Sequence, residues 1–173
     1  MSQIIPLFSR LLQRKSNKTT ENIKKEQFFL FKFENKTFAV PAVDVTEVIN
    51  VCTIVPQPAQ KATYFEGVIN VRGSVIPIIN IRDRIDMPSE YHINVNSKIL
   101  LYTLKTGCYT GMVVDNIAFS LHMGSVEPLP PAAANEKVFS YADIEGEKYP
   151  IFLIDTWLEP GDFEFLQKIS AEF

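Results

Sequence analysis

A repeat within the chain constrains the fold more than any other feature of the sequence. The segment "VRGSVIPIINIR" (71–82) lies over "IEGEKYPIFLID" (144–155) at a constant offset of 73 residues. This offset pairs two glycines, two prolines and two sets of isoleucines: Gly73 with Gly146, Pro77 with Pro150, Ile78 with Ile151 and Ile81 with Ile154. Glycines and prolines shared inside apolar runs indicate one hairpin used twice. The sequence therefore predicts two similar units.

Strand patterns fill the rest of both units. "QFFLFKF" (27–33) is followed by the turn "ENK" and a return strand that ends at Pro41, and "KILLYTL" (98–104) followed by "KTG" repeats this arrangement. "FEGVINVRGSVIPIINIR" (65–82) consists of two apolar runs broken at Arg72–Gly73, which predicts a hairpin.

Two shorter segments carry mixed patterns. "AVDVTEVI" (42–49) lacks a single period, which predicts one helical turn leading into a strand. "IRDRIDMP" (81–88) predicts a short helical cap that Pro88 ends.

Short hairpins are marginally stable alone, so each unit is expected to close toward a barrel and to bury one face on its twin. The predicted fold is mainly β, with two small antiparallel five-stranded units that share a core. Pro77 and Pro150 cannot donate to a strand ladder and are expected at edge or bulge positions.

The charge divides the chain into regions. The net charge is −3, but residues 1–26 hold six lysines and arginines against two glutamates, which leaves −7 for the remainder. We expect a basic leader at 1–26, the duplicated domain at 27–160 and a tail at 161–173. Within "MSQIIPLFSRLLQRK", helical spacing relates Ile4, Leu7, Phe8, Leu11 and Leu12. Two interpretations stay open: an amphipathic helix that docks on a partner or a membrane surface, or a frayed terminus or helix that packs on its own domain.

Several classes of protein are excluded by composition. The mild charge disfavours a nucleic-acid binder. Cys52 and Cys108 lie far apart without CxxC spacing, which fits a reducing compartment, and no apolar run is long enough to cross a bilayer. A cytoplasmic location is expected.

Catalytic patterns are also missing from the sequence. His92 and His122 are the two histidines, and neither lies near a cysteine or an acidic pair at metal-ligand spacing. There is no phosphate-binding glycine loop and no nucleophile elbow. We expect neither enzyme activity, nor a metal, nor a cofactor.

Two patches are candidates for binding. Arg72 stands at a predicted hairpin tip, where the second unit carries Glu145, and an arginine on a rigid turn beside apolar surface is typical of a binding hot spot. The alternative is that both residues only decorate an exposed turn. The second patch comprises Val45, Thr46, Glu47 and Val48, whose valines could instead belong to the core.

The stretch "GVINVRGSVIPIINIR" resembles the signature of the CheW-like domain, approximately G-V-x-N-L-R-G-x-V-x-P-V-I-D-L-R, and "AVDVTEVI" resembles the V-x-E-V segment that precedes it. The likeness covers about residues 27 to 158. The matching residues are Gly67, Asn70, Arg72, Gly73, Pro77 and Arg82. Asn80 and Val71 depart from the usual Asp and Leu.

The resemblance implies two intertwined SH3-like β-barrels and a non-enzymatic adaptor. Such an adaptor couples the cytoplasmic tips of chemoreceptors to a CheA-type histidine kinase, in chemotaxis or pilus-type motility, and meets the membrane only through receptors. Carried over by position, the receptor-binding residues are Val45, Glu47, Val48, Gly67 and Arg72, and the residues of structural turns and motifs are Asn70, Gly73, Pro77, Gly146 and Pro150. The kinase side carries over only as a surface at the barrel ends.

Two other functions remain open. One is a small-ligand-sensing β-barrel module that uses the cleft between the units, which requires a pocket with convergent polar groups. The other is a regulatory decoy that competes with another CheW-like protein, with residues 1–26 supplying the difference.

Overall fold

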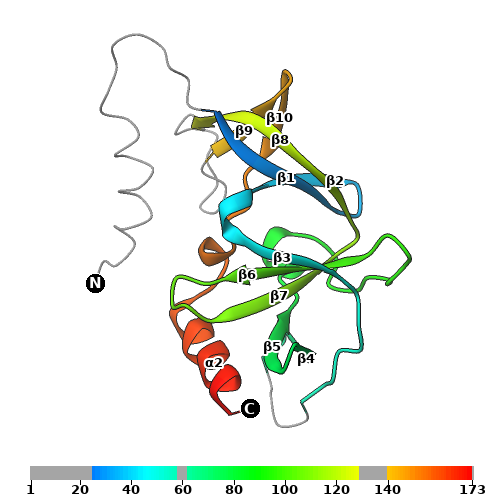
Figure 1. The fold of residues 1–173 in the computed structure, drawn as a ribbon, viewed down its shortest axis with the longest axis vertical. Helices are drawn as coiled ribbons and strands as arrows, with labels where there is room; N and C mark the ends of the chain where they lie inside the picture. Colours follow the sequence, from blue (N-terminus) through cyan, green and yellow to red (C-terminus); the bar gives the residue numbers. More distant parts are fainter. Residues whose placement is uncertain (1–24, 58–61, 129–139, 173) are drawn as a thin grey trace.

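A computed structural model describes residues 25–57, 62–128 and 140–172, and within them ten strands form two five-stranded sheets (Figure 1). The first sheet has the order β10-β9-β8-β1-β2, with bounds β1 (Lys25–Phe33), β2 (Lys36–Pro41), β8 (Asn116–Pro128), β9 (Ser140–Ile144) and β10 (Glu147–Pro150). The second has the order β3-β6-β7-β5-β4, with bounds β3 (Val45–Asn50), β4 (Phe65–Val71), β5 (Ser74–Ile79), β6 (Lys98–Thr103) and β7 (Tyr109–Val114). The described helices are η1 (Ala42–Asp44), η2 (Arg82–Ile85), η3 (Ile154–Thr156) and α2 (Pro160–Ala171).

Each sheet combines strands from both halves of the repeat. The first two strands of one half, β1 and β2, pair within a sheet that also holds the last three strands of the other half, β8 to β10. The second sheet holds β3 to β5 together with β6 and β7. The halves of the repeat are therefore not the structural units, and the intertwined arrangement implied by the family resemblance is confirmed.

Both sheets curve until their ends meet. In the second sheet, Val55 bridges to Val68, and β5 pairs with β7 in parallel at Ile78 and Gly111. In the first sheet the matching closure is a parallel bridge between Ala39 and Ile151. Each unit is thus a small SH3-like barrel, and each departs from the fully antiparallel expectation at one parallel contact, between β5 and β7 in the second barrel and between Ala39 and Ile151 in the first.

The two hairpin tips share one backbone geometry. Arg72 and Gly73 have φ of 51° and 86°, and Glu145 and Gly146 have φ of 55° and 88°. Consecutive positive φ values are those of a type I′ hairpin turn. In each turn the glycine N–H donates over 3.0 Å to a side-chain oxygen three residues earlier, which belongs to Asn70 in one hairpin and Asp143 in the other. The repeat holds to the level of single hydrogen bonds.

The two prolines of the repeat lie in different surroundings. Pro150 ends β10 at the edge of the first sheet, as expected. Pro77 lies inside β5, an interior strand, so the edge expectation is wrong for it. β5 pairs with β7 only from Ile78 onward, so the missing N–H of Pro77 falls just before that ladder begins.

The largest of the buried hydrophobic clusters in the described residues lies between the barrels. Aromatic rings of β1 and β2 meet Phe152 there, with ring centroids of Phe31 and Phe38 5.5 Å apart and those of Phe31 and Phe152 5.4 Å apart. Side chains of the second barrel, including Leu100, join the same cluster. The prediction that the units share a core is confirmed.

Residues 161–173, which were predicted to form a tail, belong mostly to helix α2, and this helix packs into the same core. Helix α2 begins with Pro160 at its first turn, and the Glu159 N–H donates to Asp162 Oδ2 over 2.7 Å as a cap. The helix buries Phe163, Leu166 and Ile169. Their spacing of three residues is the pattern of one face of a helix.

Candidate functional site

Arg72 and Glu47, two of the sequence candidates, are joined by a bidentate ion pair. Arg72 Nη1 donates to Glu47 Oε2 and Arg72 Nη2 to Glu47 Oε1, each over 2.7 Å. The hydrogen bonds from Arg72 lower the pKa of Glu47, and those to Glu47 raise the pKa of Arg72. The Arg72 side chain is 75% exposed, so the pair lies at the surface. Arg72 therefore does more than decorate a turn, because the pair spans the seam where the two ends of the second sheet meet.

A β-bulge presents Glu47 toward that seam. Val45 pairs with Tyr102 and Glu47 with Leu101, which leaves Thr46 as an extra residue. The Thr46 hydroxyl lies 2.8 Å from that of Thr103. The bulge, together with the preceding turn η1, explains the mixed spacing of this segment and confirms the predicted helical turn leading into a strand.

Val45 and Val48 are half-buried and pack against the main core. Each valine therefore contributes to the core and also leaves some apolar surface beside Glu47. We call Val45, Glu47, Val48 and Arg72 the seam surface.

Gly67 does not belong to the seam surface. It is buried, has a φ of 142°, and an added Cβ atom would lie 2.4 Å from the Val55 carbonyl oxygen. The carry-over to the receptor side is therefore revised for Gly67, because its position demands close backbone approach where the barrel closes.

Arg82 matches the family motif but received no role from the sequence. The residue is 1% exposed, and its guanidinium carbon lies between two rings, 4.4 Å from the centroid of Phe33 and 4.0 Å from that of Tyr91. Burial lowers its pKa, and an ion pair with Asp115 at 2.9 Å opposes that effect. Because Phe33 ends β1 and Asp115 follows β7, Arg82 fixes one barrel against the other.

An exposed apolar stripe on β8 was also missed. Phe119, Leu121 and Met123 are 64%, 49% and 49% exposed. The alternation in "FSLHM" was the available signal, but a strand pattern alone does not say which face meets solvent.

The described ranges hold no group of three histidine, cysteine or acidic side chains that could bind a metal ion. Cys52 and Cys108 are both free thiols. In the same ranges, no helix is long and apolar enough to cross a membrane. Residues 1–24, which include most of the predicted leader, lie outside the described residues.

Comparisons with known proteins agree with this architecture. The profile of the CheW-like domain matches residues 27–159. The chemotaxis protein CheW of Bacillus subtilis is 27% identical over 128 residues, which cover 69% of this chain and 76% of that protein. CheW of Helicobacter pylori is 22% identical over 143 residues, covering 81% and 85% of the two chains.

Among solved structures, the scaffolding protein TtCheW from Thermoanaerobacter tengcongensis superposes with a TM-score of 0.68 at 22% identity, over 79% of this chain and 94% of that one. That likeness supports the fold. The profile match spans well over half of the chain. This protein therefore belongs to the CheW-like family of non-enzymatic chemotaxis scaffold adaptors.

Proposed function

We propose that this protein couples the cytoplasmic tips of chemoreceptors to a CheA-type histidine kinase, and that the seam surface binds the receptor. The observation that carries the proposal is the bidentate Arg72–Glu47 pair, held on an exposed bulge between two half-buried valines. Family membership supplies the context of a chemotaxis scaffold.

The geometry suits binding because the arginine is already oriented. A guanidinium has five N–H donors, and Glu47 engages Nη1 and Nη2 on one side. The remaining donors and the flat faces of the group stay available to a partner at little cost in side-chain entropy. We infer that the receptor segment places an acceptor on Arg72 and apolar side chains on Val45 and Val48.

The kinase is expected to bind a different face, since an adaptor must hold both proteins at once. Each contact can then be modest, because the assembly gains from the high effective concentration of linked partners. Signal would pass as a change in these contacts rather than as a chemical step.

The test is co-sedimentation of the protein with receptor-containing membranes and kinase. The variant Arg72→Glu places two carboxylates at the seam, and we expect receptor binding to fall at least about tenfold. Lys36→Glu, an equal charge change at an exposed position of β2, is the matched control and should bind like wild type. Binding that stays at the wild-type level in Arg72→Glu, with a wild-type melting curve, contradicts the proposal.

A double variant separates seam closure from recognition. Glu47→Arg with Arg72→Glu restores an ion pair of reversed direction. If receptor binding needs the guanidinium where it stands, the double variant melts like wild type but still binds weakly. Full recovery of binding would show that a closed seam is enough and that Arg72 is not itself a receptor contact.

A further inference from the structure

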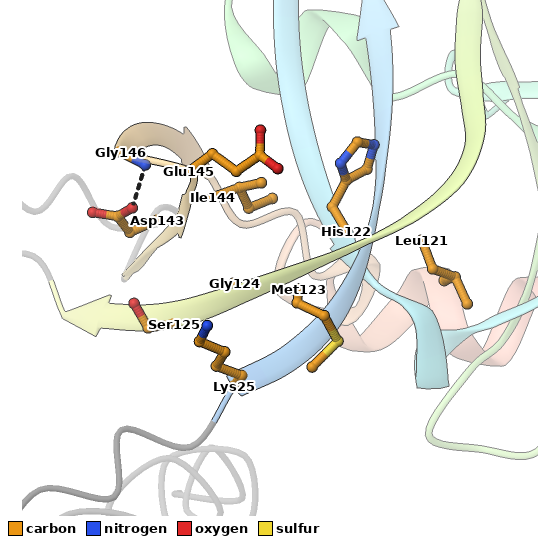
Figure 2. Close-up of a pocket in the computed structure, with 10 residues that line it drawn as sticks. All are labelled: Lys25, Leu121, His122, Met123, Gly124, Ser125, Asp143, Ile144, Glu145 and Gly146. Atoms are coloured by element: carbon orange, nitrogen blue, oxygen red, sulfur yellow. Dashed lines mark hydrogen bonds between the residues drawn. The ribbon is translucent and has the colours of Figure 1, made fainter.

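A hollow of about 590 Å³ opens on the first barrel, along β8 and the tip of the β9–β10 hairpin. Figure 2 shows Met123 and Lys25 on one side of β8 and His122 with Glu145 on the other. β9 pairs with β8 only between Ser125 and Pro128. Within the described residues, the preceding stretch of β8 has no strand neighbour on the side away from β1.

The repeat relates this unpaired stretch of β8 to the seam of the second barrel, which lies between β3 and β4. The offset of 73 residues relates Arg72 to Glu145 and Glu47 to Ser120. The ion pair that spans the second barrel's seam therefore has no equivalent in the first barrel, where the Ser120 hydroxyl lies 2.9 Å from the His122 ring instead.

The chemistry of the hollow calls for a ligand that is both apolar and cationic. Leu121 and Met123 line the hollow, and the exposed Phe119 lies two residues before Leu121 in β8. Asp143 and Glu145 supply two negative charges from the hairpin, against one positive charge from Lys25 at the start of β1. The Asp143 carboxylate accepts the Gly146 N–H through Oδ1, and the Glu145 carboxylate stands at the exposed tip of the hairpin.

We propose that residues 1–15 of this chain occupy the hollow. The segment supplies apolar residues at helical spacing (Ile4, Leu7, Phe8, Leu11 and Leu12), and it also carries Arg10, Arg14 and Lys15. The charge is complementary, because residues 1–26 are net +4 and the remainder is net −7. An arginine from this segment would form an ion pair with Glu145, as Arg72 does with Glu47 in the second barrel.

The geometry of the connection favours docking within one chain. Lys25, the first described residue, lines the hollow and pairs with Ser125 of β8. Six residues of strand separate Ser125 from Phe119, which is about 20 Å. The nine residues 16–24 can span up to about 30 Å. Residues 1–15 therefore reach the stripe easily, and the tether gives them a high effective concentration there.

Hydrogen–deuterium exchange of the full chain tests the proposal. Deleting residues 1–15 should speed amide exchange in 118–124 at least about threefold and leave the matching stretch 45–50 unchanged, because Arg72 and Glu47 already span that seam. Leu121→Glu and Glu145→Arg, both at exposed positions, should reproduce the effect in the full-length chain. Exchange in 118–124 that is unchanged by the deletion overturns the proposal.

A disulfide trap identifies the occupant directly. In a Cys52→Ser, Cys108→Ser background, Leu7→Cys with Met123→Cys should form an intramolecular disulfide whose yield does not depend on protein concentration. Leu7→Cys with Val95→Cys, where Val95 is 92% exposed, is the control and should form little. Equal yields in both pairs overturn the proposal. So do cross-linked dimers whose yield rises with concentration, since they assign the hollow to a second copy.

Discussion

The two barrels share a backbone plan but differ at their seams. Both carry a type I′ hairpin tip, and both have a register shift in the strand beside it, at Thr46 in β3 and opposite Phe28–Leu30 in β8. In the second barrel an ion pair spans the seam, whereas in the first the corresponding gap, between β8 and the β9–β10 hairpin, is a hollow lined by apolar, acidic and basic side chains. The duplication supplied two equivalent scaffolds, and a few side chains made their surfaces different.

The same divergence occurs at a second pair of positions. The repeat relates Arg82 to Asp155, so the charge changes sign again. Arg82 is buried between aromatic rings, while Asp155 is half-buried and accepts a hydrogen bond from the Lys105 N–H at 3.4 Å. Burial raises the pKa of Asp155. Arg82 therefore joins the barrels through a buried ion pair, whereas Asp155 joins them only through one long hydrogen bond, because Lys105 follows β6 and Asp155 follows β10.

The largest effect should come from breaking the joint between the barrels. Arg82→Ala removes the ion pair to Asp115 and the contacts with Phe33 and Tyr91. We expect a loss of about 3–5 kcal/mol in the free energy of unfolding, measured by urea denaturation. Asp155→Ala is the matched change in the other copy and should cost clearly less. Equal losses would mean that the two positions are not specialised.

The next effect concerns closure of the second barrel. Gly67→Ala brings a Cβ atom to 2.4 Å from the Val55 carbonyl oxygen. Because that oxygen belongs to the backbone, the clash can be relieved only if the Val55 backbone shifts and disturbs its bridge to Val68. We expect the free energy of unfolding, measured by thermal or chemical denaturation, to fall by about 3 kcal/mol. Gly161→Ala, which meets nothing within 4 Å in helix α2, should be neutral or stabilising by up to about 1 kcal/mol. A Gly67→Ala variant as stable as wild type would refute the closure role.

The smallest effect should be the same in both barrels. Gly73→Ala and Gly146→Ala each place a Cβ atom in open space at a positive φ, 86° and 88°. The only penalty is the left-handed backbone conformation that alanine must adopt, so each substitution should lower the free energy of unfolding by about 1 kcal/mol. Unequal losses in parallel melts would show that the two turns differ in ways their backbones do not reveal.

The sequence predicted the features that depend on local pattern. The repeat at Gly73 and Gly146, the hairpins and the turn before β3 follow from periodicity and turn chemistry, and the structure confirms them. The exchange of strands between halves came only from the family resemblance, because pairing partners far apart in sequence leave no local signal. The burial of Arg82 and the exposure of Phe119 were missed for the same reason, since both depend on what the rest of the chain places beside them.

The pairing of strands also has a consequence for the order of folding. The second barrel uses consecutive strands, β3 to β7, whereas the first needs β1 and β2 to wait for β8 to β10. At about 5–20 residues per second, the 74 residues between β2 and β8 take about 4–15 s to synthesise. We expect the second barrel to form first on the ribosome. The chain leaves that barrel beside β1, where the Asp115 N–H donates to the Lys32 carbonyl over 3.0 Å. β8 therefore begins next to its partner strand, which lowers the entropy cost of completing the first barrel.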